Sequence, residues 1–89
     1  MKAVITVIGK DMVGILAKVS DKCAKHNINV LEVTQSILQD MFAMIMMVDI
    51  SKADIPFTEF SEDLVRMGEE MNLSIHAMHE DIFNAMHTI

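Results

Sequence analysis

The chain has 89 residues, 52% of them hydrophobic, and a formal net charge of −6. This length predicts one domain, and the apolar content excludes an intrinsically disordered chain. The acidic balance and the absence of Trp and Tyr argue against nucleic-acid binding, which favours a basic surface with aromatic side chains for stacking.

The first predicted element is a largely buried strand over residues 3–8, a short run rich in β-branched residues. The run stops at Gly9-Lys10-Asp11, so the N-terminus does not resemble a signal peptide.

A turn bounded by glycines follows, with the sequence Gly9-Lys10-Asp11-Met12-Val13-Gly14-Ile15-Leu16. Such a turn between a strand and a helix directs free backbone N–H groups into one small space. Those groups and the helix dipole suit an anion, such as the carboxylate of a small metabolite. If the protein binds a ligand, we expect it here.

A helix is predicted from Ile15 to His26, because Leu16, Val19 and Cys23 recur at helical spacing. Its lysines lie on another face, which we expect to be solvated. The only cysteine of the chain is Cys23, so no internal disulfide can form and burial is the expected role of this thiol. These features indicate a reduced, cytoplasmic protein.

Two strands are predicted next, over 29–39 and 42–50, joined as a hairpin by a turn at Gln39-Asp40-Met41. In the first strand apolar and polar residues alternate, with Leu31, Val33 and Ile37 on the apolar face. The second strand has apolar residues at both its odd and its even positions, which predicts burial on both of its faces. Helices of so short a chain can cover only one face, so we expect the C-terminal tail or another subunit on the other. The longest apolar run, 41–48, is too short to span a membrane.

A second helix is predicted from Asp54-Ile55-Pro56, with Pro56 in its first turn. Its apolar stripe has helical spacing and consists of Phe57, Phe60, Leu64, Met67 and Met71. A short strand over 73–79 and an amphipathic tail helix over 80–89 complete the chain. The order predicts an α+β, ferredoxin-like βαββαβ sandwich over residues 1–79, with a four-stranded antiparallel sheet and two helices on one face, followed by the tail helix.

With this order, the chain resembles the ACT domain family, small regulatory modules that often bind amino acids. The residues that carry the resemblance are the segment 9–16 and His26-Asn27-Ile28-Asn29-Val30. The resemblance covers residues 1 to about 79 and is strongest to short stand-alone bacterial ACT-domain proteins.

The resemblance implies that an amino acid binds at a dimer interface, at the loop before the first helix. Asp11 would face the ligand's amino group, the N–H groups of Met12, Val13, Gly14 and Ile15 would hold its carboxylate, and Asn29 would reach it from the neighbouring subunit. Many members have Pro where this chain has Val13, and some serine-binding members have His where it has Gly9.

Each of these residues also has a purely structural interpretation. Asp11 is a natural N-cap of the helix, Gly14 could let the helix pack tightly on the sheet, and Asn29 could be an ordinary turn residue. His76 and His79 would point to opposite faces of a strand, so together with Glu80 and His87 they do not predict a metal site. The methionines are expected to fill the core and interfaces.

No catalytic motif is present, and the only arginine, Arg66, lies on the second helix rather than in the first loop, where acylphosphatases of this fold need one. The sequence therefore predicts a protein that is not an enzyme and needs no cofactor. Two functions remain open: a homodimeric sensor of an amino acid or similar metabolite, or a protein–protein interaction module that pairs its sheet and tail helix with itself or another protein.

Overall fold

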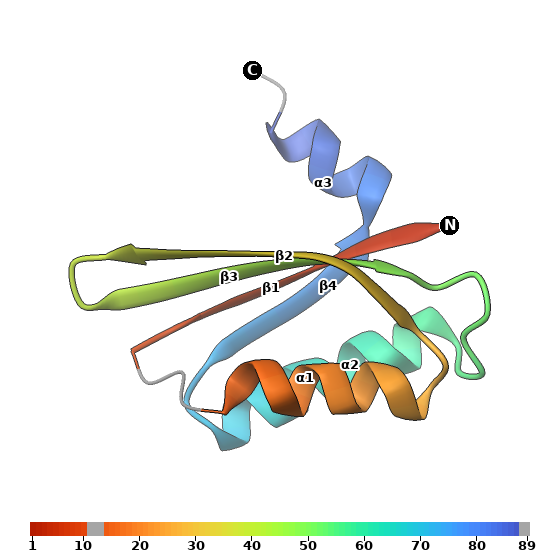
Figure 1. The fold of residues 1–89 in the computed structure, drawn as a ribbon, viewed down its shortest axis with the longest axis horizontal. Helices are drawn as coiled ribbons and strands as arrows, with labels where there is room; N and C mark the ends of the chain where they lie inside the picture. The colour runs from red at the N-terminus through yellow and green to blue at the C-terminus, as the bar shows by residue number, and fades with distance from the viewer. Residues whose placement is uncertain (11–13, 88–89) are drawn as a thin grey trace.

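The computed structural model describes residues 1–10 and 14–87, and its elements follow the predicted order (Figure 1). They are β1 (Lys2–Gly9), α1 (Ile15–Lys25), β2 (Asn29–Leu38), β3 (Met41–Asp49), α2 (Phe57–Glu70), β4 (Ser74–His79) and α3 (Glu80–His87). The sheet order is β2-β3-β1-β4, and every neighbouring pair is antiparallel. The predicted ferredoxin-like fold is confirmed.

The sheet separates the helices into two layers. Figure 1 shows α1 and α2 side by side below the sheet, and α3 rising from the opposite face at the end of β4. The face toward α1 and α2 holds the main core, because alternate residues of the strands point to it. Its fully buried side chains include Ile5, Met44, Met46, Val48, Val19, Phe60 and Leu64.

The opposite face is only partly covered. Val4 is fully buried there, in register with Met47 of β3 and Met78 of β4, while α3 packs on β1 and β4. Ile45 of β3 nevertheless keeps 37% of its surface exposed. The prediction that the third strand is buried on both faces is therefore wrong for the single chain, because the eight-residue α3 is too short to shield the whole sheet.

The hairpin turn lies where it was predicted, with Gln39 in the left-handed conformation at φ 57°. Strand β2 carries a bulge, since pairing with β3 passes from Val30 to Glu32. The bulge removes Leu31 from the alternation that was predicted to place it with Val33 and Ile37. Pro56 lies at the N-cap of α2, one residue before the helix.

Cys23 is fully buried in the core, as predicted, and burial raises the pKa of its thiol from 9.0 to about 11. We expect the native protein at pH 8 to resist a disulfide-exchange reagent and to react in urea. Because the folded pKa is the higher one, the stabilisation by the neutral thiol is complete below about pH 9 and is lost as the pH rises through about 11. Rapid labelling of the folded protein at pH 8 would contradict this burial.

Candidate functional site

The predicted ligand loop lies at the start of α1, and Gly14 is the residue at its N-cap. Asp11 was predicted to be the N-cap, and that assignment is wrong: Gly14 occupies the position, in the left-handed conformation with φ 77°. Glycine adopts this left-handed conformation without the steric cost of a Cβ atom. The predictions for Asp11, Met12 and Val13 as ligand residues lie outside the described residues.

Gly14 faces open space. A Cβ atom added there would meet no atom of the described structure within 4 Å, so the interpretation that Gly14 lets the helix pack tightly on the sheet is wrong. The first turn of a helix leaves its backbone N–H groups without intrahelical acceptors. The side chain of the next residue, Ile15, is buried in the core, so only its backbone N–H is available to a ligand.

Gly9 has a different role, because it is buried at the end of β1. A Cβ atom at Gly9 would overlap Cδ2 of Leu73, on the segment that leads into β4. Any larger residue at this position, including histidine, requires Leu73 to move.

Asn29 is exposed at the first position of β2, at the opposite end of α1 from Gly14. The eleven residues of α1 correspond to about 16 Å, so the structure does not bring these two predicted site residues together within one chain. Asn29 borders a hollow of about 390 Å³ together with Ala24, Asp49, Ser51 and Lys52.

Polar contacts hold the rim of this hollow in place. The side-chain amide of Asn27 donates to the carbonyl of Lys52 at 3.0 Å, and the backbone N–H of Ser51 donates to Asp49 at 2.9 Å. Hydrogen bonds from the Ser51 side chain and backbone hold the pKa of Asp49 below its usual value. Asp49 is therefore a carboxylate at neutral pH, and the N-terminal ammonium of Met1 lies 3.8 Å from it.

The fold and this loop can be compared with known proteins. Residues 2–78 match the family model of the ACT domain. The chain belongs to the ACT domain family. ACT domains are regulatory modules that bind small ligands, and the resemblance carried by segment 9–16 is confirmed at the level of the family.

Three similar proteins match this chain over nearly its whole length. A UPF0237 protein of Listeria innocua is 51% identical over 89 residues and is matched over its full length. A UPF0237 protein of Methanopyrus kandleri is 43% identical over 88 residues, covering 99% of this chain and 98% of the relative. An ACT domain protein from Streptococcus pneumoniae has a similar structure, with a TM-score of 0.80, 36% identity and 93% of each chain covered.

The histidines of this ACT domain are arranged as the strand pattern predicts. His76 is opposite Thr6 and His79 opposite the core residue Ala3, so the two side chains leave β4 on different faces. Within residues 1–10 and 14–87, no group of three or more His, Cys, Asp or Glu residues could hold a metal ion.

Over the same residues, no helix is long and apolar enough to cross a membrane.

Proposed function

We propose that this ACT domain is a homodimeric regulatory module that senses an amino acid or a similar small metabolite. The ligand lies between loop residues 11–15 of one copy and Asn29 of the other. The observation that carries the proposal is the open space at Gly14, where a left-handed N-cap leaves the start of α1 accessible to an anion.

A two-fold arrangement accounts for the separation of Gly14 and Asn29. In a symmetric dimer each copy contributes the same surface, so two α1 helices that pair antiparallel place the start of one against the end of the other. Gly14 of one copy then approaches Asn29 of its partner. The two identical sites complete each other only in the dimer.

Exposed apolar side chains support an interface on the same side of the molecule. Lys22 of α1 faces α2, where its ammonium lies 3.6 Å from the carboxylate of Asp63. Leu16 lies on the opposite flank of α1, toward the free edge strand β2. Leu16 is 39% exposed, and Ile37 of β2 is 71% exposed. A partner that covers these side chains would stabilise the dimer by removing apolar surface from water.

The direct test is isothermal titration of the protein with each of the twenty common amino acids. We expect one or a few to bind with a dissociation constant between about 1 μM and 1 mM, since so small a ligand makes few contacts. Asp11→Ala and Asn29→Ala should each weaken binding, whereas Asp21→Ala, on the exposed face of α1, should not. Neither Asp11→Ala nor the control should change the mass measured by light scattering. Failure of every amino acid to bind at millimolar concentration would refute the proposal.

A second function, an interaction module without a small ligand, is favoured by one observation. The face of the sheet beside α3 leaves Ile45 exposed, and α3 itself exposes Ile82 and Met86. Under this alternative, deletion of residues 80–89 lowers or changes the mass of the oligomer in light scattering, because the pairing surface is lost. An unchanged mass would count against the alternative.

A further inference from the structure

Two neighbouring hollows share lining residues at the end of the sheet where β1 begins and β4 ends. The inner hollow measures about 220 Å³ and the outer one about 490 Å³, and Met1 and His79 line both. We call the two together the end pocket. It lies at the opposite end of β1 from Gly9, about 26 Å away along an eight-residue strand. It is therefore separate from the loop at Gly14.

The inner hollow is apolar and aromatic. Apart from Met1 and His79, its lining consists of Ile28, Ile50, Ala53, Ile55, Phe57 and Phe60. The rings of Phe57 and His79 are in contact, with centroids 4.4 Å apart and planes inclined by 34°. An apolar cavity of about 150 Å³ is enough to hold benzene. The inner hollow therefore has room for one ring or a short aliphatic group.

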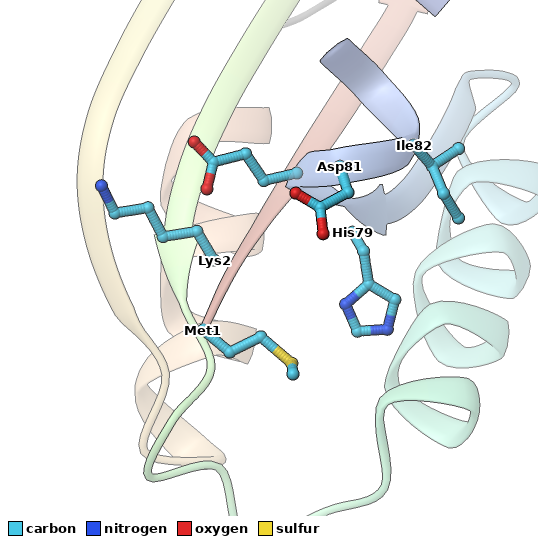
Figure 2. A pocket seen from close by; sticks show the side chains of 6 residues that line it. Met1, Lys2, His79, Asp81 and Ile82 are labelled. Carbon is cyan, nitrogen blue, oxygen red and sulfur yellow. The ribbon is translucent and has the colours of Figure 1, made fainter. Parts of the chain in front are cut away.

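The outer hollow adds acidic groups to this apolar site. Its lining includes Glu80 and Asp81, the first two residues of α3, together with Lys2. Figure 2 shows the Asp81 carboxylate, the His79 ring and the Met1 side chain directed toward the same space, whereas the Lys2 ammonium points away from it. Among the described residues, neither Glu80 nor Asp81 takes part in an ion pair. Within the part of the chain that the structure describes, no cation is paired to these two carboxylates, and the N-terminal ammonium of Met1 instead donates to the hydroxyl of Ser51 at 2.6 Å and lies 3.8 Å from Asp49.

We propose that the end pocket binds a small primary amine with a single-ring apolar body. The ring occupies the inner hollow beside Phe57, and the ammonium group lies in the outer hollow near Asp81 and Glu80. The charge complementarity selects the amine, because an amino acid would bring a further carboxylate toward the same two acidic side chains. The end pocket uses neither loop residues 11–15 nor Asn29, although Asn29 lies at the same end of the sheet, where it and Lys2 both pair with Asp49.

The test is an NMR titration of the ¹⁵N-labelled protein with 2-phenylethylamine. We expect saturable shifts at Ala53, Phe57 and Ile82 and none at Gly14. Phenylalanine, which adds a carboxylate, and 2-phenylethanol, which lacks the charge, should each bind at least about threefold more weakly at these residues. Raising the salt concentration should weaken the amine alone, since the carboxylates at the mouth are solvent-accessible.

Two variants separate the roles of charge and shape. Asp81→Asn combined with Glu80→Gln should raise the dissociation constant of the amine about tenfold and that of 2-phenylethanol hardly at all, whereas Asp21→Asn serves as the matched control. Ala53→Leu fills the inner hollow and should weaken both ligands. The proposal is overturned if 2-phenylethylamine gives no saturable shift at about 10 mM, or if the double variant binds it unchanged. If Asn29→Ala loses amino-acid binding but still binds the amine, the two sites are distinct.

Discussion

Replacement of Phe60 by Ala is expected to lower the free energy of unfolding by about 3–5 kcal/mol. Phe60 is fully buried in α2 between the helix layer and the sheet, and its ring also contacts the edge of the His26 ring at a centroid distance of 6.2 Å. Removal of the ring leaves a cavity in a domain whose total stability is only about 5–15 kcal/mol. Urea denaturation followed by circular dichroism measures the loss.

The matched control for Phe60→Ala is Glu62→Ala, two residues along the same helix. Glu62 is exposed, and alanine has a slightly better helix propensity, so the control should change the free energy of unfolding by less than about 0.5 kcal/mol. A loss below about 1.5 kcal/mol for Phe60→Ala would mean that the ring is not the centre of this core.

Gly68→Val is expected to lower the free energy of unfolding by about 2–3 kcal/mol, through overpacking. A Cβ atom at Gly68 would lie 2.8 Å from the carbonyl oxygen of Leu73 and 2.9 Å from Cγ1 of Ile75. The carbonyl is backbone and is held by its neighbours, since the N–H of Leu73 also donates to the carbonyl of Gly68 at 2.8 Å. The helix or β4 must therefore shift. Thermal unfolding measures the effect.

Glu69→Val is the control for Gly68→Val. It places the same side chain on the next residue of α2, where the position is exposed, and should cost only the difference in helix propensity, about 0.5 kcal/mol. Equal losses in the two variants would show that propensity, rather than contact with β4, limits residue 68.

The apolar stripe of the second helix shows what hydrophobic periodicity can predict without a structure. The spacing from Phe57 to Met71 correctly predicted a helix over most of its length, and Phe60 and Leu64 are buried as expected. The pattern missed Gly68, the third buried residue of α2, because a glycine contributes nothing to an apolar stripe. Residue 68 is restricted to glycine because the segment leading into β4 and β4 itself approach it closely, and this approach is visible only in the structure.

The candidate site was likewise predicted in part from the sequence, while other parts of it required the structure. The turn at residues 9–16 was located from its glycines, but the reason for each glycine required the structure. Gly14 provides a left-handed N-cap in open space, and Gly9 makes room for Leu73. No local pattern could show that Met1 and His79 line the same pocket, because they come from opposite ends of the sequence.

The sequence by itself determined the order of the strands and helices, the ferredoxin-like fold and the family, because hydrophobic periodicity and turn residues are local properties of the chain. The tertiary structure decided which sheet face stays uncovered, that α3 packs on β1 and β4, and that Gly14 and Asn29 lie at opposite ends of α1. It also created the end pocket beside His79 and Asp81. These features depend on distances between residues far apart in the chain, which only the packed fold fixes.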